Sequence, residues 1–256
     1  YNKFLSLYYI MNLKSVILGI IVVIILVVLY YWLFTDQDLN NIITLKDASM
    51  KEEVDAKTIP NVANFSYSLW VFVKQFNYNY GQKKYILFRP FQKDTITSND
   101  CYYCMYFDQY QSDLVFKLKE ADTTNVYASC KIEDIPLQKW THVLVSYRNR
   151  AIDMYVDGKL SKTCTTMKNY DVPAEPRKLM LCPSNSDVKD GSSVENGFKG
   201  FLGSVRHYSR AIQPREAYAI YKEGYSGGNW LSDMFNKYKL KIAFMEDQKE
   251  LNSILL

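Results

Sequence analysis

Residues 140–160, WTHVLVSYRNRAIDMYVDGKL, alternate between apolar and polar positions, pause, and then alternate again. Every second residue from Val143 to Tyr147 is apolar and shares one face, and the same holds from Ile152 to Val156. Arg-Asn-Arg at 148–150 interrupts the pattern, and Asp157-Gly158 ends it with residues that favour a tight reversal. The segment predicts two antiparallel strands and a turn into a third.

Similar short runs, rich in aromatic and β-branched residues, recur between polar breaks: FSYSLWVFV (65–73), KKYILFR (83–89), CYYCMYF (101–107), DLVFKLK (113–119), KLMLC (178–182) and FKGFLGSVRHYSRAI (198–212). PREAYAIYKEG, with Pro214 near its start and Gly224 past its end, predicts one helix. The pattern predicts a mainly β fold, an antiparallel two-sheet sandwich with one short helix in the C-terminal half.

The N-terminal region contains an unbroken apolar run from Ser15 to Phe34, twenty residues without a charge. As a helix it would span about 30 Å, the thickness of a bilayer core. Tyr30, Tyr31 and Trp32 stand where an aromatic belt is expected. The run is longer than the apolar part of a signal peptide, and no small-residue cleavage site follows it. We therefore predict an uncleaved transmembrane helix.

The chain is accordingly divided into an N-terminal tail (1–14), a transmembrane helix (15–34), a juxtamembrane segment (35–60), a sandwich (61–228) and a C-terminal tail (229–256). An edge strand is expected at residues 42–45. Lys3 and Lys14 before the span favour a cytoplasmic N-terminus. In the C-terminal tail, residues 231–238 fit a helical stripe, while 240–244 alternate as a strand expected to complete a sheet and pack on the sandwich. A membrane-surface or partner-binding segment is the alternative.

Composition and net charge limit the classes of function that the chain can have. The chain is 48% hydrophobic and 23% charged, which is typical of a globular protein, and tyrosine is abundant at 22 residues. The net charge of +4 is small and dispersed, with no stripe of Lys and Arg. Nucleic acid is therefore not an expected partner.

Three motifs together resemble the concanavalin A-like jelly rolls of the laminin-G and pentraxin type. They are IPLQKWTHVLVSYRNRAIDMYVDGKL, GFKGFLGSVRHYSRAIQPREAYAIYKEGY and the first core strand FSYSLWVFV, and they cover roughly residues 61–228. The resemblance implies a two-sheet jelly roll. In such a fold we expect Trp70, Trp140, Tyr155 and Phe201 to contribute to the core, and Gly158 to make the turn.

A narrower resemblance rests on the phrases IPLQKW, DMYVDGKLSKTC and REAYAIYKEGY behind a single N-terminal anchor. It is to membrane-linked virion proteins of large icosahedral double-stranded DNA viruses, in which such a domain is a minor capsid component. This resemblance implies a bilayer and capsid proteins as partners.

Enzymatic motifs are incomplete. A retaining glucanase needs paired carboxylates, and EADTT at 120–124 lacks the second Glu of the family's Glu-x-Asp-x-Glu strand. GYSGG at 224–228 follows a predicted helix instead of a strand, and His142 and His207 both precede it, unlike a nucleophile elbow. We expect packing or hydrogen-bonding roles for both histidines, and no catalytic residue.

Metal ligands and cofactors are not expected either. Calcium is bound by many laminin-G and pentraxin relatives, and Asp187, Asp190 and Glu195 share one loop, but solvated loops often look the same. Cys101-x-x-Cys104 is half of a zinc or redox motif without a second half. In a regular strand, residues i and i+3 point to opposite faces, which does not suit one metal ion.

Cys130 and Cys164 each lie just outside the hairpin of residues 140–160. If their strands lie side by side, a Cα separation of about 5.5–6 Å permits a bridge. We predict a disulfide between them, which requires an oxidising route.

Two functions remain open at this level. The first is a non-enzymatic, membrane-anchored structural protein that links an internal viral membrane to the capsid shell. The second is a membrane-tethered, lectin-like module that binds carbohydrate. The narrower resemblance and the missing ligand set favour the structural role.

Overall fold

The chain consists of two compact units, Tyr1–Asp38 and Leu39–Leu256. The computed structural model describes residues 17–29, 39–92, 100–122, 126–225, 241–246 and 249–255.

In the first unit, residues 17–29 form a helix with exposed apolar side chains, within the stretch predicted to be helical. The ends of the predicted span lie outside the described residues: Ser15, Tyr30, Tyr31, Trp32 and Phe34. Among the described residues, no helix combines the length and the apolar character needed to cross a membrane.

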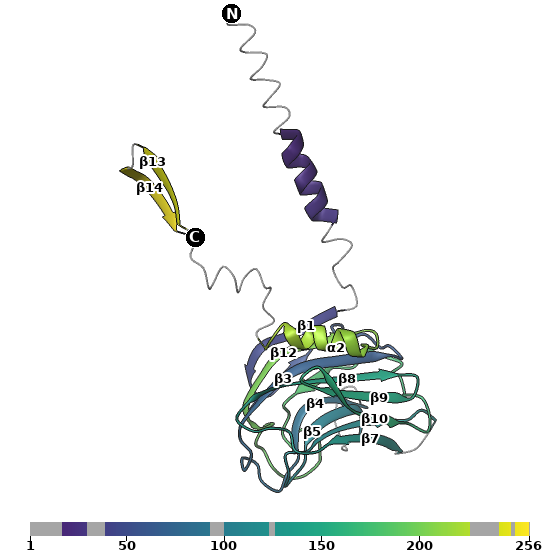
Figure 1. Ribbon diagram of the computed structural model, residues 1–256. Coiled ribbons are helices and arrows are strands. Elements are labelled where there is room, and N and C mark those ends of the chain that lie inside the picture. Colours follow the sequence, from purple (N-terminus) through teal and green to yellow (C-terminus); the bar gives the residue numbers. More distant parts are fainter. Residues whose placement is uncertain are drawn as a thin grey trace, which may run out of the picture. The chain divides into compact units, whose positions relative to one another are not determined.

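The second unit contains two six-stranded sheets in which every pairing is antiparallel (Figure 1). Sheet A has the order β1 (Leu39–Asp47), β12 (Lys199–Tyr208), β3 (Phe65–Gln75), β8 (Trp140–Arg148), β9 (Ala151–Val156) and β10 (Lys159–Thr165). Sheet B has the order β2 (Glu52–Val54), β11 (Leu179–Leu181), β4 (Lys84–Pro90), β5 (Cys101–Phe107), β6 (Leu114–Lys119) and β7 (Tyr127–Ile132). The predicted mainly β architecture of two antiparallel sheets is confirmed.

The main core lies between the sheets and is built mostly from alternate residues of the strands. The apolar positions predicted to share a face in β8 and β9 all lie in or against it: Val143, Val145, Tyr147, Ile152, Met154 and Val156. Sheet B contributes large residues such as Leu87, Phe107 and Phe116, each fully buried. Burial of these side chains is the main favourable term for folding.

Helix α2 (Pro214–Lys222) is the helix that the sequence predicts, and it lies on the outer face of sheet A (Figure 1). A second cluster of buried side chains joins it to the sheet: Leu144, Tyr155, Tyr208, Ile212, Ala217 and Ile220. Because the helix covers this face, strands β3 and β8 are buried on both sides.

The four side chains expected in the core between the sheets lie elsewhere. Trp70 is 8% exposed and Tyr155 is 1% exposed, but both lie on the outer face under α2 rather than between the sheets. Trp140 is half-buried and stacks on Tyr225 with ring centroids 4.7 Å apart. Phe201 is 40% exposed, so its assignment to the core was wrong. The apolar outward positions pack against a helix and loop, which period-two reasoning does not foresee.

The turn between β9 and β10 is the predicted Asp157-Gly158 reversal. Both residues have positive φ, 46° and 73°, as a type I′ turn requires. Asp157 Oδ1 accepts a hydrogen bond of 2.9 Å from the backbone N–H of His142. A Cβ added at Gly158 would lie 2.9 Å from Tyr221 Cβ, so glycine also permits close packing of α2.

The sandwich begins before the expected boundary at residue 61. Strands β1 and β2 both lie in the segment expected to be juxtamembrane, and each pairs with a sandwich strand, β12 and β11. The edge strand expected at 42–45 is therefore part of a longer strand. Charged residues in this segment are typical of exposed edge strands.

In the C-terminal tail, β13 (Lys241–Glu246) forms the strand predicted there. It pairs with β14 (Lys249–Leu255) in a separate two-stranded sheet, and does not complete sheet A or sheet B as expected. The residues of the alternative helical stripe, 231–238, lie outside the described residues.

Candidate functional site

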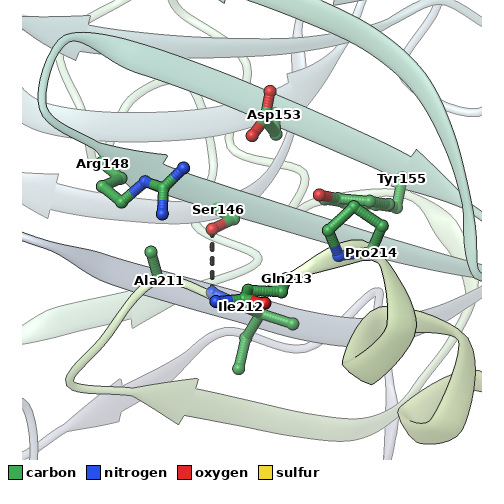
Figure 2. A pocket seen from close by; sticks show the side chains of 8 residues that line it. All are labelled: Ser146, Arg148, Asp153, Tyr155, Ala211, Ile212, Gln213 and Pro214. Carbon is green, nitrogen blue, oxygen red and sulfur yellow. Dashed lines mark hydrogen bonds between the residues drawn. The ribbon is translucent and has the colours of Figure 1, made fainter.

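A pocket of about 280 Å³ opens on the outer face of sheet A, beside the start of α2 (Figure 2). We call it the α2 pocket. It is lined by Ser146, Arg148, Asp153, Tyr155, Ala211, Ile212, Gln213 and Pro214.

The strand alternation that builds the core also builds this pocket. Ser146 of β8 pairs with Asp153 of β9, and both are at outward positions, as are Arg148 and Tyr155 further along. The pocket is closed on the helix side by residues 211–214, which lead into α2. The Ile212 N–H donates 3.0 Å hydrogen bonds to the hydroxyls of Ser146 and Ser66, which fixes this segment on the sheet.

Two polar side chains of the α2 pocket, Ser146 and Asp153, each accept one hydrogen bond, while Arg148 and Tyr155 are less engaged. Arg148 is exposed, and within the described ranges no carboxylate lies in ion-pair distance of its guanidinium. Asp153 Oδ1 accepts a 2.6 Å hydrogen bond from the Thr163 hydroxyl. No hydrogen bond to the Tyr155 hydroxyl is found in the described part of the chain, although the residue is 1% exposed.

The Tyr155 hydroxyl is protonated at neutral pH, because its pKa is raised above the usual value for tyrosine. Burial raises the pKa of this phenol, the nearby Asp153 carboxylate raises it further, and the Arg148 guanidinium lowers it. At neutral pH the pocket therefore offers a hydroxyl donor, a carboxylate acceptor and a cationic donor around one cavity. Such a mixture suits a ligand with several hydroxyl groups, each both donor and acceptor.

A second hollow of about 360 Å³ is lined by Gln111, Ser112, Asp113, Lys131, Glu133 and Asp134. Its buried carboxylate is already used, because Asp113 accepts a 2.8 Å hydrogen bond from Lys131. That hydrogen bond is the main reason why the pKa of Asp113 is lowered. The hollow is therefore better described as an ion-paired surface.

The two histidines have the structural roles expected from the sequence. His142 Nε2 lies 2.9 Å from the Ser68 hydroxyl, and burial lowers the pKa of His142 to about 4. His207 is also buried, and burial lowers its pKa to about 3. Both rings are neutral at physiological pH, and neither lines the α2 pocket.

Two of the three acidic loop residues considered as calcium ligands, Asp187 and Asp190, are engaged elsewhere. Asp187 Oδ1 accepts a hydrogen bond from Lys51, and Asp190 Oδ2 accepts from Lys83 and from the Tyr85 hydroxyl. In the described residues no group of three or more His, Cys, Asp or Glu side chains is arranged to hold a metal ion.

The structure joins Cys130 to Cys164 by a disulfide, the pair that the sequence predicts, with a Cα separation of 5.7 Å. The two strands are not neighbours in one sheet. Cys130 lies on β7 and Cys164 on β10, the last strands of sheets B and A, so the bond joins the two sheets at one side of the sandwich (Figure 1).

Tyr80 and Tyr110 form an exposed aromatic pair on two loops, missed in the sequence. They are 65% and 60% exposed, with ring centroids 5.5 Å apart. The signal that could have found them is a tyrosine within a polar turn sequence, NYNYGQ and DQYQS. For the α2 pocket, the signal is the set of polar residues at outward positions of β8 and β9.

Two antiparallel sheets packed face to face, with a polar pocket and a short helix on one outer face, define a jelly-roll sandwich. Residues 47–217 match the family model of the concanavalin A-like lectin/glucanase superfamily, laminin-G type, and the chain belongs to this superfamily. The jelly-roll resemblance drawn from the sequence is confirmed.

Solved structures with a similar fold include botulinum neurotoxin domains. The serotype D ligand binding domain in complex with N-acetylneuraminic acid is 11% identical, with a TM-score of 0.52, over 71% of this chain and 42% of that chain. The receptor binding domain of the C/D mosaic serotype is 15% identical, with a TM-score of 0.51, over 70% and 41%. At this level of identity the likeness shows the fold alone.

A curated relative is the BEACH domain-containing protein lvsE of Dictyostelium discoideum, which is 30% identical over 89 residues. The match covers 33% of this chain and 4% of that protein. Because the superfamily includes binding modules and enzymes, the fold does not select between them.

Proposed function

We propose that this chain is a membrane-anchored, non-enzymatic binding protein whose sandwich binds a glycan in the α2 pocket. The observation that carries the proposal is the convergence of Arg148, Asp153 and Tyr155 on one cavity. Sugar hydroxyls would supply hydrogen bonds to Arg148 and Tyr155, and a further one to the Asp153 carboxylate. The serotype D botulinum neurotoxin domain of similar fold is in complex with N-acetylneuraminic acid, which supports a glycan as the ligand class to test.

A glycosidase is the less favourable alternative for the same pocket. Glycoside hydrolysis normally needs two carboxyl groups on either side of the scissile bond. The lining of the α2 pocket contains one, Asp153. Glu216, on the first turn of α2, makes an ion pair with Arg210 and is not part of the lining. Binding without turnover is therefore the proposed activity.

The test is glycan-array binding by the full chain in detergent, followed by affinities for the best ligand. Arg148→Ala removes the cation, Asp153→Asn removes the negative charge, and Tyr155→Phe removes the hydroxyl. The first two changes should weaken binding by at least about tenfold, since a hydrogen bond to a charged group is worth about 1.5–3 kcal/mol. Tyr155→Phe should weaken it by up to about tenfold, since a neutral hydrogen bond is worth about 0.5–1.5 kcal/mol. Lys74→Ala is the matched control, an exposed cation of sheet A away from the lining. Equal affinity in all four variants, or no selective glycan binding, refutes the proposal.

The anchor is the second part of the proposal. It is supported by the uncharged run from Ser15 to Phe34 and by the exposed apolar side chains of helical residues 17–29. The full chain should stay in the membrane pellet after carbonate extraction. Replacing Ile21 and Ile24 by Lys should release it, because each charge at a span centre costs about 2.5–3.5 kcal/mol. Extraction of the unaltered chain into the supernatant would exclude the anchor.

A structural role in a virion is the second candidate function. In this role the chain is a minor capsid protein that ties an internal viral membrane to the capsid shell. The exposed pair Tyr80 and Tyr110 favours it, because tyrosine is enriched at protein interfaces. Anchoring many copies at one surface would let modest affinity per copy suffice.

Cross-linking with mass spectrometry in intact particles separates the two functions. Links from the loops of Tyr80 and Tyr110 to a shell protein would support the tether, and Tyr110→Ala should remove them. Selective glycan binding without such links would leave the glycan-binding role alone.

A further inference from the structure

Strand β5 contains an irregularity that places two cysteines on the same face. Its register with β4 shifts between Arg89 and Pro90, which pair with Tyr103 and Cys101. Tyr102 and Tyr103, although adjacent, both contribute to the core between the sheets. This is the effect of a β-bulge, which adds one residue and breaks the alternation.

The bulge overturns the expectation that Cys101 and Cys104 point to opposite faces. Both thiols lie on the outer face of sheet B, in a buried cluster with Tyr85, Phe88, Met180 and Val188. Their exposed fractions are 0% and 2%, and the Cys101 thiol donates to Cys104 Sγ at 3.1 Å. The sulfur atoms need to approach by only about 1 Å to reach the length of a disulfide.

The donor set does not suit a metal ion. Structural zinc takes four ligands, and no third His, Cys, Asp or Glu side chain joins this pair among the described residues. The third buried thiol, Cys182, belongs to the core on the other side of sheet B. The short distance between the two sulfur atoms instead favours a disulfide bond between them.

The environment in which this chain matures is indicated by its other cysteines. The Cys130–Cys164 disulfide forms only where thiols are oxidised. We infer that Cys101 and Cys104 form a second disulfide in the mature protein, within β5. This modification site is independent of the proposed glycan binding, because it lies on the other sheet from the α2 pocket.

The oxidation is a thiol–disulfide exchange with a donor disulfide, such as oxidised glutathione. One cysteine thiolate attacks the donor, which forms a mixed disulfide and releases one thiol. The second cysteine then displaces the remaining half of the donor. In sum, two protein thiols and one donor disulfide yield one protein disulfide and two donor thiols.

The bond forms while the chain folds, before the outer face of sheet B closes over the sulfur atoms. In the folded state, burial raises the pKa of Cys101 well above its usual range, which leaves little thiolate for exchange. A folded, reduced pair should therefore react slowly.

The test starts with the full chain, reduced and denatured in detergent, and refolds it in a buffer of oxidised and reduced glutathione. The product is then denatured without reductant, alkylated and mapped by mass spectrometry. Of the five cysteines, only Cys182 should be labelled, and a peptide with a Cys101–Cys104 bond should be recovered. Labels on Cys101, Cys104 and Cys182, with Cys130 and Cys164 bonded, would overturn the inference.

Two variants serve as controls, because in each the Cys130–Cys164 bond reports whether the chain has folded. Cys104→Ser should add a label on Cys101 and leave the Cys130–Cys164 bond in place. Cys182→Ser should give no label at all, which shows that Cys182 is not a partner. A label on Cys101 and Cys104 in the Cys182→Ser protein would contradict the second disulfide.

Discussion

Removing the disulfide between Cys130 and Cys164 tests how far the two sheets depend on a covalent link. The bond joins β7 to β10, which belong to different sheets and share no backbone ladder. Cys130→Ala and Cys164→Ala, singly and together, remove it with little change in volume. Because the sheets still share the main core, we expect the variants to fold.

The magnitude follows from the chain between the two cysteines. Their separation of 34 positions corresponds, in the loop-entropy model, to a stabilisation of about 4 kcal/mol at 25 °C. For a chain of this size that is a fall in melting temperature of about 10 °C. The loss arises mainly because the unfolded chain becomes less restricted.

Urea denaturation followed by tryptophan fluorescence gives the free energy of unfolding for each variant. Each single variant should lose about as much as the double variant, because either change removes the same bond. A loss below about 1 kcal/mol in the double variant would refute the reasoning. So would single losses that add up in the double variant.

Three further predictions concern the outer face of sheet A. Gly158→Ala should destabilise by at least about 2 kcal/mol in urea denaturation, and by more than Gly224→Ala, since both have positive φ but only Gly158 has close neighbours. Equal losses would contradict the packing argument. Because burial lowers the pKa of His142 to about 4 from 6.5, the unfolded chain binds the proton more readily between these values. Stability should therefore fall from pH 6.5 to 4, where His207, whose pKa burial lowers to about 3, contributes in the same direction. His142→Gln should reduce that slope; an unchanged slope rules this histidine out. Trp140→Ala should cost about 2 kcal/mol, less than the 3–5 kcal/mol of a fully buried ring, because Trp140 is half-buried against Tyr225. An unchanged melting temperature would show that this stack does not stabilise the fold.

The hairpin of β8 and β9 was predictable because its alternation is strict on the inner face. The same is true of the turn at Gly158 and of α2, whose first residue, Pro214, is recognisable in the sequence. These elements are specified by residues close together in the chain. Local periodicity and turn chemistry are sufficient to find them.

The outer face of sheet A was not predictable in the same way. Apolar residues occupy both faces of β3, so the pattern does not say whether Trp70 faces the other sheet or a helix. That depends on where α2 docks, which involves residues far apart in sequence. The α2 pocket is missed for the same reason, since Arg148 and Asp153 look like ordinary outward polar positions until Gln213 lies beside them.

The pairing of Cys101 with Cys104 was missed for a more local reason. Strict alternation was assumed for β5, and one inserted residue reverses the conclusion for every position beyond it. The sequence CYYCMYF has two adjacent tyrosines, and nothing in it distinguishes a bulge from an ordinary strand. The register with β4 makes the difference visible.

The disulfide also gives the sandwich an asymmetry. The two sheets are joined covalently at one edge, by the disulfide between β7 and β10. At the opposite edge lie β1 and the three-residue β2, where a partly exposed ion pair between Lys46 and Glu52 joins the two strands. Such an ion pair contributes little. We therefore expect partial opening of the domain to begin at the edge formed by β1 and β2, and the edge with the disulfide to keep its structure longest.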